Sequence, residues 1–234
     1  MNNYILFSDF FLDDKVLIHF LKKNKFKLTI FPAEFCLVDK NKEKQFDLLE
    51  KFKQIITNKG PQNNIILSAG PIEMLAFFIN NISLELKCNI SNILLMGGSF
   101  DGGNITEYAE YNLYKNPKAF QDLIKTKLPI SLFCLNSTRD LYVRKLDYEK
   151  TKDKTLKELL KKFENLNFKH KASLNDLILY SYIVNPLNFS SFEKNIDIIL
   201  EGEKKGMLID GPYKLRVKSI IDKEKFYKIF EDSY

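Results

Sequence analysis

Short apolar runs alternate along this chain with segments whose apolar residues recur at helical spacing. The apolar runs predict buried strands at 4–7, 27–31, 64–68, 92–96 and 130–135. The helical spacing predicts helices at 14–24, 44–58, 71–80 and 117–126, the third opening with Pro71, a good first-turn residue. Near-continuous apolar strands separated by helices are typical of a parallel sheet. We therefore predict an α/β fold, with a mostly parallel central sheet and helices on both of its faces.

The last third of the chain has a different pattern. Two helices are predicted at 155–166 and 175–184, and a closing helix with an acidic start at 222–232. Between them, short apolar runs predict strands at 196–200, 206–210 and 215–221. Because no internal repeat, low-complexity linker or boundary interrupts the pattern, we expect one domain over residues 1–234.

Polar segments follow three of the predicted strands. Asp9 comes after the first strand, SAGP (68–71) after the third and MGGSFDGGN (96–104) after the fourth. In open parallel sheets, ligands bind beyond the carboxyl ends of the strands. We therefore expect these segments to meet at one edge of the sheet and to form a ligand site there.

Three carboxylates, Asp9, Asp13 and Asp14, lie within six residues at the end of the first strand. Capping of the following helix explains Asp13 or Asp14, because acids are favourable at a helix N-terminus. It does not explain all three, whose mutual repulsion raises their pKa values or prevents burial. A bound cation resolves this conflict, and hard oxygen ligands suit calcium or magnesium. Spacing alone leaves capping and metal binding both open.

A second polar segment follows the fourth strand, at 96–117. Its glycines allow close approach of the backbone to a ligand, although a plain surface loop has the same composition. The segment then presents Asn104, Glu110 and Asn112, with Tyr111 between the last two. Amides and carboxylates are groups that hydrogen-bond sugar hydroxyls. Neither a GxxxxGK[ST] nor a strand–GxGxxG–helix phosphate-binding pattern occurs here.

Taken together, these motifs resemble those of the inosine–uridine-preferring nucleoside hydrolase family. The family's DxDPGxDD signature matches FSDFFLDD (7–14), so its last three aspartates align with Asp9, Asp13 and Asp14. Further matches are GPIEMLA (70–76), the long block MGGSFDGGNITEYAEYNLYKNPKAF (96–120), LNDLILYSYIVNPLNF (174–189) and IILEGEKKGMLIDG (198–211). The resemblance runs from near residue 4 to the last residues, and its most specific part is 96–120. It implies a nucleoside hydrolase-like fold with a Rossmann-like core.

The resemblance also implies an activity: calcium-dependent hydrolysis of the N-glycosidic bond of ribonucleosides, giving ribose and free base in nucleoside salvage. It implies calcium ligands at Asp9, Asp14 and Asp176, with a backbone carbonyl near Ala69, and makes Asp9 the general base for the attacking water. The implied ribose contacts are Asp13 to the 2′-hydroxyl, Asn112 to another hydroxyl, Asn104 and Glu110 to the 5′-hydroxyl, and Met96 under the sugar.

The sequence departs from the family pattern at its base-binding end. Phe10-Phe11 replace the usual Pro-Gly, so we expect a different turn, and Glu34 stands where an asparagine is expected, either replacing a ribose contact or adding negative charge. Asn175 replaces the histidine that acts as leaving-group acid in part of the family, and asparagine has no proton to transfer. The segment that covers the base is missing, which marks a divergent, shortened member. The alternative is therefore a relative that binds ribosides or calcium without turnover; a structural protein with a vestigial pocket is a third reading.

Other residues bear on the missing acid and on base stacking. Glu34 or a tyrosine is a candidate replacement acid. His19 lies among apolar residues and is expected to pack, whereas His170 lies in a lysine-rich stretch and is expected to be exposed. Without tryptophan, stacking on the base falls to Phe10, Phe11 or Tyr111, unless these belong to the core.

Composition narrows the range of expected binding partners and locations. The net charge of +6 is scattered among acids, so no nucleic-acid partner is expected beside the small-molecule ribonucleoside. No apolar run approaches the roughly 20 residues of a membrane span, and the first residues lack signal-peptide features. Cys36, Cys88 and Cys134 are far apart, which favours a reducing cytoplasm without disulfides. Family members often form dimers or tetramers, but no interface for a homo-oligomer is readable.

Overall fold

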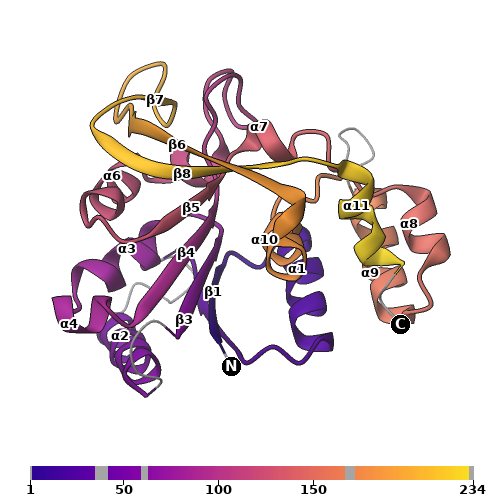
Figure 1. The fold of residues 1–234 in the computed structure, drawn as a ribbon, viewed down its shortest axis with the longest axis horizontal. Helices are drawn as coiled ribbons and strands as arrows, with labels where there is room; N and C mark the ends of the chain where they lie inside the picture. The colour runs from indigo at the N-terminus through magenta and orange to yellow at the C-terminus, as the bar shows by residue number, and fades with distance from the viewer. Residues whose placement is uncertain (1, 35–41, 59–62, 167–171, 232–234) are drawn as a thin grey trace.

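Eight strands form one sheet in the order β2-β1-β3-β4-β5-β8-β6-β7 (Figure 1). The computed structural model describes residues 2–34, 42–58, 63–166 and 172–231, so Cys36 and His170 lie outside the described residues. Neighbouring strands from β2 to β8 in this order are parallel, and β6 runs antiparallel to both β8 and β7. The predicted α/β class with a mostly parallel sheet is confirmed. The strands are β1 (Asn3–Ser8), β2 (Leu28–Pro32), β3 (Asn64–Ala69), β4 (Ile90–Met96), β5 (Ile130–Phe133), β6 (Phe189–Ile198), β7 (Leu208–Asp210) and β8 (Tyr213–Ile220).

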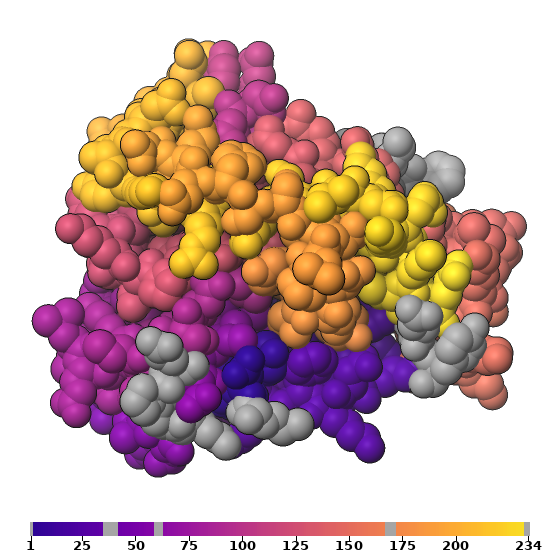
Figure 2. All heavy atoms as spheres, viewed as in Figure 1, coloured from indigo at the N-terminus to yellow at the C-terminus, as the bar shows by residue number. Residues whose placement is uncertain are grey.

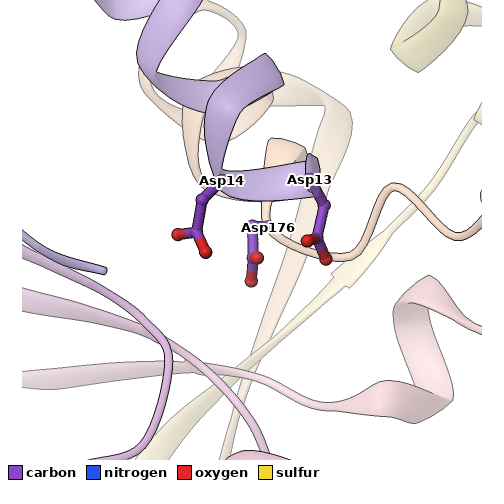
Figure 3. Close-up of side chains that lie close together, drawn as sticks. All are labelled: Asp13, Asp14 and Asp176. Atoms are coloured by element: carbon purple, nitrogen blue, oxygen red, sulfur yellow. The ribbon is translucent and has the colours of Figure 1, made fainter. Parts of the chain in front are cut away.

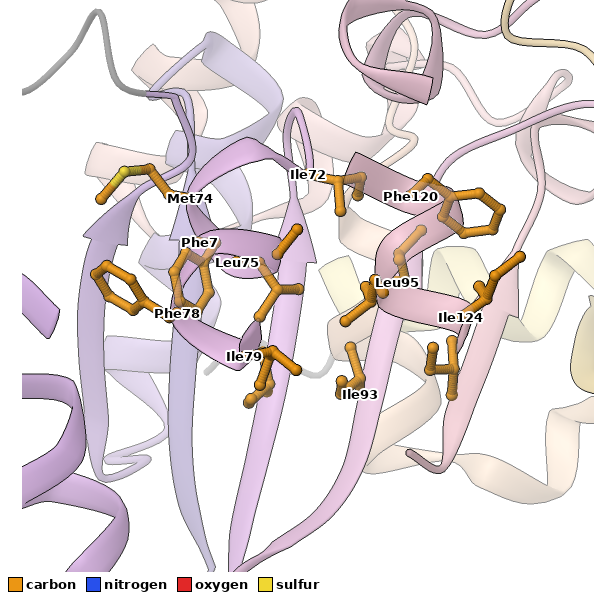
Figure 4. Packing of buried hydrophobic residues seen from close by; sticks show 14 of the residues in the cluster. Phe7, Ile72, Met74, Leu75, Phe78, Ile79, Ile93, Leu95, Phe120 and Ile124 are labelled. Carbon is orange, nitrogen blue, oxygen red and sulfur yellow. The ribbon is translucent and has the colours of Figure 1, made fainter. Parts of the chain in front are cut away.

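Helices cover both faces of the sheet. Neighbouring residues of a strand point to opposite faces, so each strand contributes side chains to two clusters. Phe7 packs with α2, α3 and α6 on one face, and Leu6 packs with α1, α9, α10 and the C-terminal helix on the other. Figure 4 shows the first cluster, in which side chains of α3 and α6 lie over those of the strands. The helices are α1 (Leu12–Lys23), α2 (Lys42–Thr57), α3 (Glu73–Asn80), α4 (Leu84–Lys87), α5 (Tyr111–Lys115), α6 (Pro117–Lys125), α7 (Leu135–Thr138), α8 (Lys145–Lys150), α9 (Lys154–Leu166), α10 (Leu177–Val184) and α11 (Lys223–Tyr227).

The second face brings distant parts of the chain together. Helix α1 packs against both α9 and α10, which come more than 130 residues later in the chain. In Figure 2 the orange side chains around α10 lie directly against the indigo and purple N-terminal segment. The N-terminus of α1 and the start of α10 therefore lie near each other, at the edge of the sheet where β1 ends.

Two of the differences from the sequence-based predictions have a clear local cause. Helix α3 begins at Glu73 and not at Pro71, because Ile72 takes the N-cap position. The predicted strand at 196–200 is the end of a ten-residue strand, β6, whose first half carries exposed polar residues such as Ser190 and Glu193 and so lacks an apolar signal. No helix in the described part of the chain combines the length and apolar character needed to cross a membrane. The single-domain expectation stays a prediction.

Candidate active site

One pocket of about 430 Å³ opens at the carboxyl edge of the parallel strands. The segments after β1, β3 and β4 all contribute to its wall, as expected from the polar sequences that follow these strands. Nine of the residues proposed for catalysis, metal binding or ribose binding line it: Asp9, Asp13, Ala69, Met96, Asn104, Glu110, Asn112, Asn175 and Asp176. The fold therefore gathers groups from both ends of the sequence around one cavity.

A carboxylate cluster forms one end of this pocket. Asp13, Asp14 and Asp176 each place an oxygen within 4.8 Å of the others. Figure 3 shows Asp13 and Asp14 projecting from the first turn of α1 into the same space as Asp176, which precedes α10. Asp9 joins the cluster, since its carboxyl group lies close enough to that of Asp14 to raise the pKa of Asp14. The four acids come from two segments that the packing of α1 on α10 holds together.

Burial dominates the electrostatics of this cluster. It raises the pKa of Asp13 to about 6 and the pKa of Asp176 well above the ordinary aspartate value. The pKa of Asp14 is also raised well above that value, first by burial and then by the neighbouring carboxyl groups of Asp9 and Asp13. Carboxylates in such surroundings either keep protons or bind a cation, because like charges at short range destabilise the ionised forms.

The two carboxylate oxygens of Asp14 have different surroundings. Oδ2 accepts a hydrogen bond from the backbone N–H of Phe11 at 3.2 Å, so Asp14 caps the N-terminus of α1. Oδ1 is buried and has no hydrogen-bond partner among the described residues, although Asp14 is fully buried. Capping and ligand binding are therefore compatible in this one residue, and a buried carboxylate oxygen without a partner is the kind of atom that a metal ion satisfies.

The turn that positions these acids differs from the family's Pro-Gly turn. Phe10 has a φ of +64°, in the left-handed region that proline cannot adopt. Its N–H donates to Ser8 Oγ at 3.0 Å, and Phe11 then takes the N-cap position of α1. The turn places the side chains of Asp13 and Asp14 in the carboxylate cluster from the first turn of the helix, and Asp13 lines the pocket.

A polar wall faces the cluster. Glu110 is buried and is the N-cap residue of α5, where its carboxylate accepts hydrogen bonds from the N–H groups of Asn112 and Leu113 at 2.8 and 3.2 Å. It also accepts one from Gly98 at 2.8 Å, which ties the glycine loop to the helix. Burial raises the pKa of Glu110 to about 7. The three donors fix this carboxylate in a single position on the pocket wall.

Two amides complete this wall. Asn112 Nδ2 donates to the carbonyl of Met96 at 3.2 Å, and Asn104 Oδ1 accepts from the N–H of Tyr111 at 2.9 Å. Within the described residues no hydrogen bond engages the second polar atom of either amide. The wall therefore presents an acceptor on Asn112 and a donor on Asn104, both held in place by backbone groups.

The remaining end of the pocket contains Ser173, Asn175 and aromatic side chains. Ser173 Oγ lies 2.7 Å from Asn175 Oδ1. Phe11 and Tyr111 line the pocket, as two of the stacking candidates, whereas the third, Phe10, is exposed outside it.

Phe163 of α9 also lines this end and was not predicted. Its spacing from Leu156 and Leu160 gives α9 an apolar face, and all three are buried. That signal identifies core residues but does not reveal which one reaches a pocket.

Two further residues considered for the site from the sequence lie outside the pocket lining. Glu34 does not line the pocket, and its carboxylate forms a salt bridge of 3.0 Å with Lys115. Its negative charge is thereby compensated. His19 Nε2 lies 2.8 Å from Asp153 Oδ2 and outside the pocket lining, which agrees with a packing role. Cys134 is buried with a free thiol and Cys88 is exposed and also free.

The fold and the site define a class of protein in which an acidic, metal-suited cluster faces a wall of amides at the carboxyl edge of a parallel sheet. The profile of the inosine-uridine preferring nucleoside hydrolases matches residues 14–228, and the chain belongs to this family. The pyrimidine-specific ribonucleoside hydrolase RihA of Salmonella paratyphi A is 27% identical over 160 residues. That match covers 63% of the chain and 51% of the relative, so the chain matches about half the length of this curated relative.

Solved structures support the fold. A plant nucleoside hydrolase, PpNRh1, superposes with a TM-score of 0.79 at 16% identity, covering 99% of this chain and 98% of its own. The purine-preferring ribonucleoside hydrolase from Gardnerella vaginalis gives a TM-score of 0.77 at 16% identity, with 99% of each chain covered. At such low identity these similarities establish the architecture, and the assignment of an activity depends on the site.

Proposed function

We propose that this protein hydrolyses the N-glycosidic bond of ribonucleosides with the help of calcium, releasing ribose and the free base. The observation that carries the proposal is the buried Asp14 oxygen without a partner among the described residues, in a residue clustered with Asp13 and Asp176 beside a pocket whose wall carries two amides. Unpaired buried carboxylates are costly unless a cation or a proton compensates them. Calcium suits the site because it accepts carboxylate, carbonyl and water ligands in flexible geometry.

The proposed metal ligands are Asp9, Asp14 and Asp176, together with the backbone carbonyl of Ala69. Asp14 Oδ1 is available for this role, and Ala69 lies at the carboxyl end of β3 on the pocket wall. When bound, the ion would lower the pKa of a coordinated water and hold the ribose hydroxyls. Asp9 is the most exposed of the three ligands, which suits it to accept a proton from that water as general base. General bases of this kind contribute about 10²–10⁴-fold to rates.

The polar wall is proposed to bind the ribose. Asp13 would accept a hydrogen bond from the 2′-hydroxyl, Asn112 would use Oδ1 for another hydroxyl, and Asn104 and Glu110 would hold the 5′-hydroxyl, over the side chain of Met96. As the bond to the base breaks, positive oxocarbenium character develops on the sugar. Carboxylates fixed beforehand around that charge stabilise the transition state more than the ground state.

A second candidate function is binding of ribosides or calcium without turnover. One observation favours it: Asn175, which stands where part of the family has its leaving-group acid, accepts a hydrogen bond from Ser173 and has no proton to transfer. The two candidates differ only in whether sugar is released. Homo-oligomerisation and a cytoplasmic location stay predictions.

The experiment combines binding and turnover. The protein is incubated with calcium and a panel of purine and pyrimidine ribosides, including a nitrophenyl riboside, and reducing sugar is assayed. We expect sugar release that Asp9→Asn abolishes and that the control Asp47→Asn, on the exposed face of α2, preserves. Calcium-dependent riboside binding without sugar release would replace the first candidate with the second, and binding of neither ligand would reject both.

A further inference from the structure

We propose that Asn136 of α7 and Arg139 at the end of that helix are positioning residues for the glycine-rich loop at 97–104, and that through this loop they keep Asn104 at the wall of the pocket. The inference rests on the proposed function, because Asn104 is one of the residues proposed to bind the ribose. It adds two residues that do not themselves line the pocket. The consequence is that removal of either side chain weakens riboside binding and leaves the chemical step unchanged.

The composition of the loop makes it depend on support from its neighbours. Four of its eight residues are glycines, and glycine loses more conformational entropy on ordering than any other residue. Gly98 and Gly102 have φ angles of +76° and +60°, in the left-handed region. At Gly103 a Cβ atom would lie 2.0 Å from the carbonyl oxygen of Ala109, so no side chain fits there. The loop therefore keeps its glycines, and contacts with other elements supply the order that its own residues do not.

Arg139 holds the outer turn of the loop. Its Nη2 donates to the carbonyl of Gly102 at 3.0 Å and also to the carbonyl of Asp101. Ser99 Oγ lies within hydrogen-bond distance of the same two carbonyls, but a hydroxyl has one proton and serves only one of them at a time. Arg139 therefore supplies the donor that the second carbonyl needs.

Asn136 holds the middle of the loop with both ends of its amide. Its Oδ1 accepts the backbone N–H of Phe100 at 3.1 Å, and its Nδ2 donates to the carboxylate of Asp101. These two contacts use the acceptor and the donor side of the amide, so they determine its orientation. Asn136 and Arg139 therefore bind adjacent residues of the loop from one helix.

Helix α7 is itself anchored to the rest of the fold. The N–H of Leu135 donates to the carbonyl of Gly98 at 2.9 Å, and Ser137 Oγ donates to the backbone carbonyl of Lys218 in β8 at 3.0 Å. Leu135 and Ser137 are buried, whereas Asn136 is exposed. The buried residues tie α7 to the sheet, and the exposed side chains reach the loop after β4, which lies beside α7 (Figure 1).

The part of the loop that α7 holds leads directly to Asn104. Gly103 N–H donates to the carbonyl of Glu107 at 2.9 Å, and Asn104 N–H donates to the carbonyl of Ala109 at 3.1 Å. Asn104 Oδ1 then accepts the N–H of Tyr111 at the start of α5. Asn104 is exposed although it lines the pocket, so burial does not confine its side chain. Its position at the wall therefore depends on the course of the loop.

The test is a double-mutant cycle of Arg139→Ala and Asn104→Ala, with kcat and KM measured for a riboside that the unmodified protein hydrolyses. We expect Arg139→Ala to raise KM by about 10-fold, the equivalent of one neutral hydrogen bond, with kcat unchanged. Asn136→Ala is expected to have the same effect. In the Asn104→Ala background, Arg139→Ala should raise KM no further, because a positioning residue acts through the residue that it positions. A general loss of stability would instead give additive effects.

Backbone amide exchange tests the contacts of α7 with the loop in the absence of substrate. Arg139→Ala should accelerate exchange at 98–104 by about 10-fold and leave exchange in β5 unchanged. Arg216→Ala is the matched control, because it removes another exposed arginine, on β8. It should change neither KM nor the exchange of the loop.

Three results would each overturn the inference: additive effects in the cycle, a lower kcat without a higher KM, or unchanged exchange at 98–104. Because Asn136 and Arg139 are exposed, their replacement leaves the core intact, and if one variant does not fold, the other takes its place in the same cycle. If no riboside is hydrolysed, the proposed hydrolase is rejected, and the exchange measurement still decides whether α7 holds the loop.

Discussion

Replacement of Asp14 by asparagine should stabilise the protein without calcium and destabilise it, relative to the unmodified protein, with calcium. The side chain is fully buried, and one of its oxygens accepts the N–H of Phe11. Asparagine has nearly the same size and retains a carbonyl for that bond. The substitution therefore removes the charge and the metal ligand while it preserves packing and the helix cap.

The sign of the effect follows from the raised pKa of Asp14. A carboxyl group whose folded pKa lies above its unfolded value contributes stability below the unfolded pKa, and this is lost as the pH rises through the folded pKa. In the metal-free protein this penalty opposes folding at neutral pH, where the same carboxyl group ionises freely in the unfolded chain. The substituted asparagine carries no such penalty, so we expect the metal-free Asp14→Asn variant to be more stable than the unmodified protein. For a chain of this size each 1 kcal/mol of added stability corresponds to a rise in Tm of about 2–4 °C.

Calcium should reverse the order of stability of the variant and the unmodified protein. Calcium at about 100 times its Kd stabilises the folded state by about 2.7 kcal/mol. The variant lacks one of the carboxylates proposed to bind the ion. Thermal unfolding followed by circular dichroism, in a chelator and in calcium, measures both effects. Asp47→Asn, at an exposed position of α2, serves as the control and should change neither value. A metal-free Asp14→Asn variant that is less stable than the unmodified protein, or equal stabilisation of both by calcium, would refute the reasoning.

Three further predictions concern the turn, the core and the pH. Phe10→Pro should destabilise the protein by about 3 kcal/mol or more, because proline cannot adopt a φ of +64°, whereas Phe10→Gly should be at least as stable as the unmodified protein; urea unfolding compares them. Phe7→Ala should cost about 3–5 kcal/mol in the same assay, because the ring is fully buried against Phe31, Phe52 and Phe78. In a chelator, Tm should fall as the pH rises from the ordinary carboxyl range to about 6 and about 7, the raised pKa values of Asp13 and Glu110, and should level off above them. Calcium should reduce the part due to Asp13, because the nearby cation stabilises the ionised aspartate; a Tm that rises over this range would contradict the pKa directions.

The apolar pattern was enough to predict most of the sheet. Residues such as Leu6 and Phe7 alternate between two helix-covered faces, and a strand buried on both faces has a continuous apolar sequence. The pattern does not encode the order of the strands, which depends on pairings between distant residues. It also missed the first half of β6, because Ser190 and Glu193 lie on an exposed part of the sheet, where polar residues are tolerated.

The acidic half of the site was predictable for a different reason. Carboxylates crowded after a buried strand have few physical explanations, so residue type and spacing are informative there. Ser173 and Phe163 carry no comparable signal. Ser173 reaches the pocket through its bridge to Tyr142, and Phe163 reaches it because α9 packs against α1. Both placements are tertiary contacts, which local patterns in a sequence do not specify.

The turn between the aspartates shows why its residues can change while the acids stay. The backbone N–H of Phe11 lies 3.2 Å from Asp14 Oδ2 and 3.4 Å from Asp9 Oδ1, so one amide group joins the two carboxylates. That contact requires an N–H at position 11, and it does not involve the aromatic rings of Phe10 and Phe11, which are both exposed. Every residue except proline supplies the N–H. The spacing of the acids is therefore set by a backbone group, and it can persist after the Pro-Gly pair has been lost.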